Sequence, residues 1–329
     1  MTRHRWLMLL TLLVASLALA ACGDDDDDDG GGGGGGDTAA QEESGGSGIQ
    51  SDEANSGTTI TVGSKNFTEQ KVLGEIYAQA FEAAGYTVEK QLNLGDEKTA
   101  LAALEGGDID AYPEYTGTAL LSFFGVQADK LPKDPNAAYE QAREGFAEKN
   151  LTAFEPTPFT SSNEVAVTKE TAEENDLTTI SDLESVAGEF TLYGSPECRQ
   201  RLDCLLGLQE VYGLEFQKFT PVDIALRHEV LTKGQADVSI VFTTDPQIQR
   251  EEFVLLEDDK GMFPPYNSTL VMRNEIAEQG GAALEEVVTM VNEGLTAEAM
   301  QELNARVDLD KKTPEEVAGE YLSETGLVQ

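Results

Sequence analysis

Short β-rich segments and amphipathic helices alternate along most of this chain, and that order restricts the fold more than any other feature. Residues 68–84, for example, place apolar side chains at the three- and four-residue spacing of a helix face, and Gly85 follows where helices commonly end. The first half predicts strands at 59–62, 87–94 and 109–112 and helices at 68–84, 98–105 and 117–124. Such a β-α-β-α order predicts the α/β class, with mixed, mostly parallel sheets covered by helices.

The same order returns in the second half of the chain. It predicts strands at 164–168, 190–193 and 238–242, a short helix capped by Ser181, a helix at 222–233, and C-terminal helices at 284–294, 296–306 and 313–322. The span from about residue 58 to 329 is long enough for one large domain or for two lobes.

One stretch of each half has the same spacing of residues. The series Leu104, Gly107, Asp110 and Tyr115-Thr116 recurs as Leu231, Gly234, Asp237 and Phe242-Thr243. In each copy a helix ends at glycine, a strand follows, and an aromatic residue lies past the carboxyl end of that strand, the edge at which open α/β sheets bind ligands. Two facing lobes would bring Tyr115 and Phe242 to opposite walls of one cleft. The alternative is a chance match of a common helix–glycine–strand arrangement.

The first 22 residues have the organisation of a secretory signal. Arg3, His4 and Arg5 precede an apolar run at 7–18, too short to span a bilayer as a mature helix, and small residues then lead to Cys22. This junction resembles the lipobox of bacterial lipoproteins. We interpret residues 1–21 as a signal peptide and Cys22 as a lipidated residue that anchors the mature chain. The alternative is an ordinary signal peptide with an incidental cysteine.

Residues 22–57 are predicted to form a disordered tether, because they have almost nothing apolar to bury. Residues 24–29 are all aspartate and residues 30–36 all glycine. The whole chain has 61 acidic and 22 basic residues, a formal net charge of −39. This balance leaves no basic face for nucleic acid and suits an extracytoplasmic protein.

The cysteine and histidine content points to a disulfide and not to a metal site. Cys198 and Cys204 lie six residues apart, and in an oxidising compartment we interpret them as a disulfide closing a small loop. No metal or other cofactor is expected, since His4 lies in the signal peptide and we interpret His228 as structural. No Gly-Lys-Ser/Thr phosphate motif occurs, so any ATPase would be a separate protein.

Four motifs follow one another along the chain: Gly63-Ser-Lys-Asn-Phe-Thr-Glu-Gln70, Tyr112-Pro-Glu-Tyr-Thr-Gly-Thr118, Val241-Phe-Thr-Thr-Asp245, and Leu256-Glu-Asp-Asp-Lys260 with Phe263-Pro-Pro-Tyr266. They resemble the osmoprotectant-binding proteins of the glycine betaine, carnitine and choline importers. The resemblance covers the chain from about residue 59 to its C-terminus.

The resemblance implies a type II periplasmic-binding-protein fold, in which two α/β lobes are joined by two chain crossings. We place the crossings near residues 156–163 and 262–268. Lobe 1 would then comprise residues 58–158 plus 267–329, and lobe 2 residues 159–266.

A betaine-type ligand has a permanent cation, which donates no hydrogen bond, and a carboxylate, which favours a charged partner. Aromatic faces can hold the cation, and arginine or lysine the carboxylate. The resemblance puts Tyr115, Phe242 and Tyr266 in an aromatic cage, and Lys65, Thr118 and Arg201 around the carboxylate. The residues alone leave other roles open: core packing for Tyr115 and Phe242, packing of a crossing for Tyr266, a surface lysine for Lys65, a helix cap for Thr118, and Arg199 in place of Arg201.

The aromatic cage departs from the family pattern at two positions. Phe242 stands where tyrosine is usual and keeps the aromatic face. Asn163 stands where the family commonly has another tyrosine, which removes one wall, although we keep Asn163 as a ligand-binding residue. A larger, less methylated or more polar osmolyte is therefore the alternative ligand.

The resemblance implies binding and not catalysis. A ligand would dock on one lobe, the other lobe would close, and an ABC permease with its ATPase would receive the ligand. The protein would be an extracytoplasmic monomer anchored to the membrane. Three alternatives remain: a binding protein for an amino acid or another small solute, an enzyme on a similar fold, which would lack a nucleophile–His–acid set, and a surface lipoprotein that senses a ligand or docks a partner.

Overall fold

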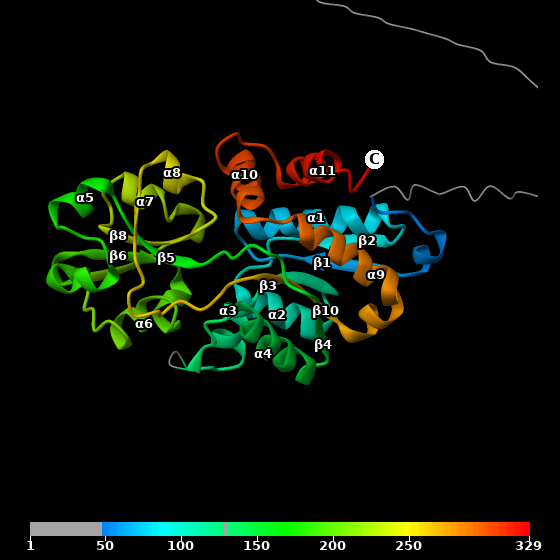
Figure 1. The fold of residues 1–329 in the computed structure, drawn as a ribbon, viewed down its shortest axis with the longest axis horizontal. Coiled ribbons are helices and arrows are strands. Elements are labelled where there is room, and N and C mark those ends of the chain that lie inside the picture. Colours follow the sequence, from blue (N-terminus) through cyan, green and yellow to red (C-terminus); the bar gives the residue numbers. More distant parts are fainter. Residues whose placement is uncertain (1–47, 128–129) are drawn as a thin grey trace, which may run out of the picture. The chain divides into compact units, whose positions relative to one another are not determined.

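Two five-stranded sheets organise the computed structural model, which describes residues 48–127 and 130–329 (Figure 1). The first sheet has the order β2 (Thr87–Gln91), β1 (Thr59–Gly63), β3 (Ala111–Tyr115), β10 (Ser268–Arg273) and β4 (Leu151–Ala153). The second has the order β7 (Lys218–Pro221), β6 (Thr191–Gly194), β8 (Val238–Phe242), β5 (Asn163–Val167) and β9 (Val254–Leu256).

Strand directions follow the same rule in both sheets. β10 in the first sheet and β5 in the second run antiparallel to both of their neighbours, and the remaining pairs are parallel. All strands of a sheet but one therefore point the same way. The predicted α/β class with mixed, mostly parallel sheets is confirmed.

The repeated spacing in the sequence has a structural counterpart in these sheets. Oδ2 of Asp110, before β3, accepts the backbone N–H of Thr61 in β1 at 2.8 Å. Oδ2 of Asp237, before β8, accepts the backbone N–H of Thr191 in β6 at 2.7 Å. The two aspartates thus join equivalent strands in the two sheets, so the match in spacing reflects a shared topology.

Helices cover both faces of the first sheet. On one face lie α1 (Thr68–Ala83), α9 (Asn274–Gly294), α10 (Ala297–Asp308) and α11 (Pro314–Glu324), and on the other α2 (Glu97–Gly106), the π-helical turn η2 (Ala119–Phe123) and α4 (Pro135–Glu148). Side chains of β10 alternate between these two cores, as the period of a strand requires: Leu270 and Met272 enter the first and Val271 the second. The apolar stripe predicted for residues 68–84 is buried in the first core.

Helices around the second sheet are short. They are α5 (Lys169–Glu174), α6 (Leu205–Glu210), α7 (Glu229–Thr232) and α8 (Gln247–Arg250), with 3₁₀ turns η4 (Ile180–Ser185), η5 (Ala187–Glu189), η6 (Pro196–Gln200) and η7 (Ile224–Leu226).

Two local predictions in this second lobe are wrong. The helix expected at 222–233 is divided into η7 and α7. The helical turn expected to be capped by Ser181 is capped by Thr179, whose side chain forms a reciprocal capping box with Asp182.

The chain crosses between the sheets twice, before β5 and after β9. The two crossing segments pair with each other, because Thr160 and Asn267 form an antiparallel bridge and the Ser161 N–H donates to the Tyr266 carbonyl at 3.1 Å. Thr160 and Ser161 lie within the first predicted crossing, residues 156–163, and Tyr266 and Asn267 within the second, residues 262–268. The residues that the structure describes form one contiguous unit, so the numerical limits of the two lobes remain a prediction.

The predicted tether is wrong in its last ten residues. Residues 48–57 contain the 3₁₀ turn η1 (Glu53–Gly57), and the N–H groups of Ile49 and Asp52 donate to Leu327 and Ala84 carbonyls at 2.8 and 3.1 Å. The predicted signal peptide, Cys22 and the rest of the tether lie outside the described residues. None of the described helices has the length and apolarity needed to cross a membrane.

Candidate functional site

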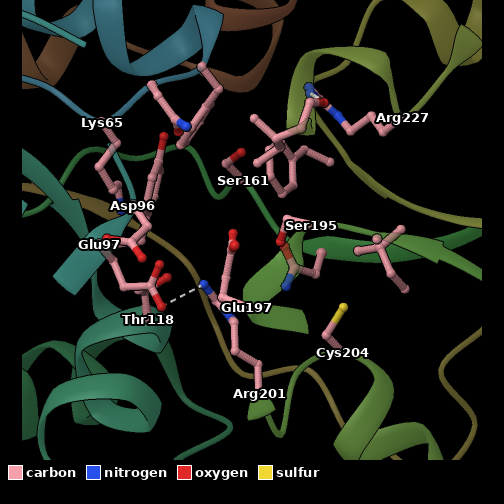
Figure 2. A pocket seen from close by; sticks show the side chains of 18 of the residues that line it. Lys65, Asp96, Glu97, Thr118, Ser161, Ser195, Glu197, Arg201, Cys204 and Arg227 are labelled. Atoms are coloured by element: carbon pink, nitrogen blue, oxygen red, sulfur yellow. Dashed lines mark hydrogen bonds and ion pairs between the residues drawn. The ribbon is translucent and has the colours of Figure 1, made fainter. Parts of the chain in front are cut away.

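A cavity lies where strands of both sheets end (Figure 2). Tyr115 lies at the carboxyl end of β3 and Phe242 at the carboxyl end of β8, and both line the cavity. All seven residues predicted to bind a ligand line it: Lys65, Tyr115, Thr118, Asn163, Arg201, Phe242 and Tyr266. The cavity has a volume of about 70 Å³. A cavity needs about 10–15 Å³ on this scale to hold one water, so this space is large enough for a small solute molecule to be considered.

Three aromatic rings form a row along one wall. The ring of Phe67, which sequence reasoning missed, lies between those of Phe242 and Tyr115, at centroid distances of 5.3 and 6.3 Å. A protein cation lies against each end of the row: Lys65 Nζ is 4.6 Å from the Tyr115 ring centroid, and the Arg227 guanidinium carbon is 4.6 Å from that of Phe242. One face of the Tyr115 ring and one face of the Phe242 ring are thus close to a protein cation, which shows that these rings can accept positive charge.

Lys65 does not lie at the surface. Its ammonium forms an ion pair with Glu114, and the two side chains are 5% and 0% exposed. Glu114 also accepts hydrogen bonds from the Tyr112 hydroxyl at 3.0 Å and the Tyr115 N–H at 2.7 Å. The Tyr115 hydroxyl donates to Glu69, and burial together with the charge of Glu69 raises the pKa of Tyr115 well above its usual value.

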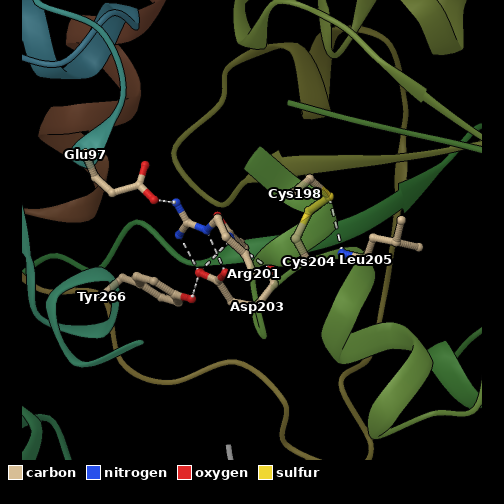
Figure 3. The surroundings of a disulfide bond; sticks show 8 residues. Glu97, Cys198, Arg201, Asp203, Cys204, Leu205 and Tyr266 are labelled. Carbon is tan, nitrogen blue, oxygen red and sulfur yellow. Dashed lines mark hydrogen bonds and ion pairs between the residues drawn. A yellow bond between two sulfur atoms is a disulfide. The ribbon is translucent and has the colours of Figure 1, made fainter. Parts of the chain in front are cut away.

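The predicted disulfide between Cys198 and Cys204 is confirmed, with the Cα atoms 5.1 Å apart (Figure 3). The bond closes the loop that carries Arg201 and leads into α6. Arg199, the competing candidate in this loop, stacks instead on Phe219 with its guanidinium carbon 4.8 Å from the ring centroid, and it does not line the cavity.

The Arg201 guanidinium faces carboxylates on both of its sides. Its Nε and Nη2 donate to the two oxygens of Asp203 at 2.8 and 2.6 Å, and its Nη1 lies 3.2 Å from Oε1 of Glu97 (Figure 3). Burial opposes the charge of Arg201, but these carboxylates hold its pKa well above the usual value. Glu97 belongs to α2 in the first lobe, so this ion pair joins the two lobes.

Asp203 also explains the positions of Asn163 and Tyr266. Nδ2 of Asn163 donates to Oδ2 of Asp203 at 3.1 Å, and the Tyr266 hydroxyl donates to the same oxygen at 2.5 Å. Burial, and next the charge of Asp203, raise the pKa of Tyr266 well above its usual value. Asn163 therefore supplies a donor to a buried carboxylate at the position where the loss of one aromatic wall was expected.

Thr118 follows β3 and is 4% exposed. The sequence left open a role as a helix cap, but its side chain makes no capping hydrogen bond at the start of η2, the turn that it precedes. Its position in the cavity wall is the one observed feature that bears on its function.

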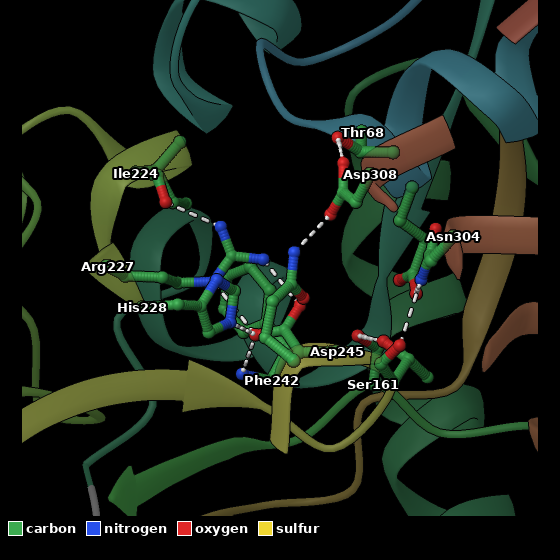
Figure 4. Close-up of polar contacts among 12 residues, drawn as sticks. Thr68, Ser161, Ile224, Arg227, His228, Phe242, Asp245, Asn304 and Asp308 are labelled. Carbon is green, nitrogen blue, oxygen red and sulfur yellow. Dashed lines mark hydrogen bonds and ion pairs between the residues drawn. The ribbon is translucent and has the colours of Figure 1, made fainter. Parts of the chain in front are cut away.

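Sequence reasoning missed Arg227, which is buried in the wall of the cavity next to Phe242 (Figure 4). Nε and Nη2 of Arg227 donate to the two oxygens of Asp245, and Nε2 of His228 lies 2.7 Å from Oδ2 of Asp245. His228 is 6% exposed, in agreement with the structural role assigned to it. Glu97 was missed as well, although Asp96-Glu97 immediately precedes a predicted helix, where acidic residues are favoured.

Two α/β lobes with a small cavity of aromatic and charged residues between their strand ends define a solute-binding protein. The chain belongs to the family described as the substrate binding domain of ABC-type glycine betaine transport system, which matches residues 58–324. Membership confirms the predicted family and makes the chain the extracytoplasmic, substrate-binding component of such a system and not an enzyme.

Known proteins of this kind resemble most of the chain. A glycine-betaine-binding protein of Pseudomonas aeruginosa is 33% identical over 284 residues, which cover 82% of this chain and 89% of that protein. An ergothioneine transport permease/ergothioneine binding protein of Helicobacter pylori is 31% identical over 82% of this chain, but over 48% of its own length. The crystal structure of a glycine betaine/carnitine/choline ABC transporter superposes with a TM-score of 0.65 at 27% identity, covering 82% of this chain and 99% of that one.

Proposed function

We propose that this protein captures a small zwitterionic or quaternary ammonium osmolyte of the glycine betaine, choline or carnitine class in the cavity between its lobes. It then presents the osmolyte to the permease and ATPase of an ABC importer. The supporting observation is that all seven residues predicted to bind such a ligand line one cavity.

The chemistry of the walls supports both ends of a zwitterion. Tyr115, Phe242 and Tyr266 offer aromatic surface to a methylated ammonium, which otherwise has no hydrogen bond to make. The resemblance assigns the carboxylate to Lys65, Thr118 and Arg201, with Asn163 beside them, and these roles remain predictions.

The proposal includes the cellular setting of the protein. Residues 1–21 would act as a signal peptide, and a lipidated Cys22 would hold the mature chain at the outer side of the cytoplasmic membrane as a monomer. Residues 22–47 would be the tether.

Calorimetric titration tests the proposed ligand class. Glycine betaine, choline, carnitine, ectoine, proline betaine and ergothioneine are titrated separately into the protein, with ordinary amino acids as controls. We expect at least one osmolyte to bind far more tightly than about 1 mM, a value equivalent to about −4 kcal/mol. Binding of an amino acid, with every osmolyte weaker than that limit, would show that the ligand class is wrong.

A further inference from the structure

Helix α10 packs on the first sheet, but one of its faces contacts the loop at residues 243–247, which follows β8 of the second sheet. Gln301, Asn304 and Asp308 lie three and four residues apart, so they share this face, which we call the α10 polar face. The side-chain amides of Gln301 and Asn304 donate to the first two carbonyls of the loop at 3.1 and 3.2 Å. Asp308 accepts the side-chain amide of Gln247 at 3.0 Å (Figure 4).

The α10 polar face is also connected to one wall of the cavity. Nδ2 of Asn304, which binds the loop, donates as well to Oε2 of Glu69 at 3.0 Å. Oε1 of Glu69 accepts the Tyr115 hydroxyl at 2.6 Å. All three side chains are buried, and Tyr115 is the one of them that lines the cavity. The amide of Asn304 thus divides its two N–H groups between the loop of one lobe and the partner of Tyr115 in the other.

The loop at residues 243–247 is connected to the opposite wall. It begins directly after Phe242, and Asp245 within it accepts the Phe242 N–H at 2.8 Å. The hydroxyls of Thr244 and Ser161 lie 3.0 Å apart, and Ser161 belongs to the first crossing and lines the cavity. A movement of the loop away from α10 would therefore be transmitted to both the wall and the crossing.

These contacts are polar, and two of the amides in them are incompletely satisfied. Oδ1 of Asn304 and Oε1 of Gln247 are buried and have no hydrogen-bond partner among the described residues. A buried acceptor without a partner costs free energy, which hydration would recover if the loop moved away from α10. The net stabilisation from the contact is therefore small, which leaves the separation of the lobes sensitive to a bound ligand.

We propose that the α10 polar face is a latch between the lobes, and that Asn304 couples it to the cavity wall through Glu69. Closure of the lobes belongs to the proposed function, on which this inference rests. The inference adds that residues outside the cavity set how long the lobes stay closed. Asn304 is a positioning residue, because it acts on the ligand through Tyr115. Since the latch bonds hold only while the loop lies against α10, they slow the release of a ligand more than they change its association.

The pair of Asp308 and Gln247 allows a test with substitutions of equal size. Gln247→Glu places a carboxylate against Asp308, and like charges should open the latch. Combining Gln247→Glu with Asp308→Asn exchanges the two partners, so an amide again donates to a carboxylate and the net charge is that of the unmodified protein. Gln249→Glu adds the same charge at an exposed position two residues further along α8 and is the matched control.

Calorimetry and surface plasmon resonance of the full chain with glycine betaine measure the affinity and the dissociation rate. We expect Gln247→Glu to weaken binding about five- to tenfold, mainly through faster dissociation. The double variant should return to within about twofold of the unmodified protein, as should Gln249→Glu. Melting temperatures show whether each variant is folded.

The coupling through Asn304 is tested by a double-mutant cycle with Tyr115→Phe, which keeps the ring but removes the hydroxyl that binds Glu69. Asn304→Ala and Tyr115→Phe should each speed the dissociation of glycine betaine, and their combined effect should be smaller than the product of the two. A combined effect equal to the product would show that Asn304 does not act through Glu69.

Small-angle X-ray scattering of the ligand-free full chain separates this inference from the proposed function, because it needs no ligand. Gln247→Glu should have a larger radius of gyration than the unmodified protein, and the double variant should not. If Gln247→Glu kept both the radius and the dissociation rate of the unmodified protein, or if the double variant stayed as weak as the single one, the latch would be wrong while the proposed function stood. If the unmodified protein bound no glycine betaine or other osmolyte, the proposed function would fail, and scattering would still decide whether the latch exists.

Discussion

At the scale of single residues, the cavity is built from cations that are paired with the protein's own carboxylates. Lys65, Arg201 and Arg227 pair with Glu114, Asp203 and Asp245. Each carboxylate accepts further hydrogen bonds, which offsets the cost of removing two charges from water. Pairs of this kind hold long side chains in one geometry before a ligand arrives, which lowers the entropy cost of binding.

The two parts of the Tyr266 side chain have different roles in this wall: its ring lines the cavity, and its hydroxyl donates to Asp203. We predict that Tyr266→Leu weakens both glycine betaine and choline by roughly three- to thirtyfold, the range of one cation–π contact. Tyr266→Phe keeps the aromatic ring, and Asp203 still accepts hydrogen bonds from Arg201 and Asn163. The affinity for both ligands should therefore stay within about threefold of that of the unmodified protein. Equal losses in the two variants, measured by calorimetry, would mean that the ring does not contact the cation.

The sequence could predict which residues line the site, but it could not predict which of their side chains form ion pairs and hydrogen bonds with one another. The predicted strand ends and the repeated spacing correctly placed Tyr115 and Phe242 at one cavity, because the position of each residue is fixed by its own strand. Glu114, the partner of Lys65, is 49 residues away in the sequence. Glu97, one of the partners of Arg201, belongs to the other lobe. Such pairs depend on tertiary packing, which cannot be predicted from hydrophobic periodicity or from capping rules.

At the scale of elements, the loop closed by Cys198 and Cys204 positions one wall of the site. The chain-entropy estimate for a loop of this size is about 2 kcal/mol. We predict that replacing both cysteines by serine lowers the free energy of unfolding by about that amount in urea denaturation, and that a reducing agent does the same to the unmodified protein. The reducing agent should leave the free energy of unfolding of the serine variant unchanged. If it lowered the stability of that variant as well, the reducing agent would be acting on something other than this disulfide.

Glu164 in β5 gives the fold a pH dependence. Burial, and next the charge of Asp258, raise its pKa from 4.5 to about 7. A carboxyl group with a raised folded-state pKa stabilises the fold fully below pH 4.5 and loses that contribution as the pH rises through 7. We predict that Glu164→Gln is more stable than the unmodified protein by about 2 kcal/mol at pH 8.5 and equally stable at pH 4. A difference that does not change between these pH values in urea titrations would contradict the assignment.

The helix expected at 222–233 shows why some elements could not be predicted. Its apolar periodicity is real, but η7 and α7 are separated by Arg227 and His228, which turn towards Asp245. A tertiary interaction thus overrides a local pattern. By contrast α4 was missed although its signals are local, since Asp134 caps it and Pro135 occupies its first position.

At the scale of the whole molecule, two sheets of one topology face a single cavity, and contacts between the lobes surround it. The Arg201–Glu97 ion pair is one, and the Asn304 side-chain amide, which donates to the Thr244 carbonyl at 3.2 Å, is another. The paired crossings form a short two-stranded connection that can bend while both sheets stay intact. Opening and closing of the lobes would then admit and retain the ligand.

The central claim is that a small charged osmolyte binds inside this cavity, and a crystal structure of the protein with glycine betaine tests it most directly. We predict the ligand between the lobes, its trimethylammonium group against the rings of Tyr115, Phe242 or Tyr266 and its carboxylate on the side of Lys65, Thr118 and Arg201. A ligand found outside the cavity, or in it without contact to Tyr115, Phe242 or Tyr266, would contradict the account.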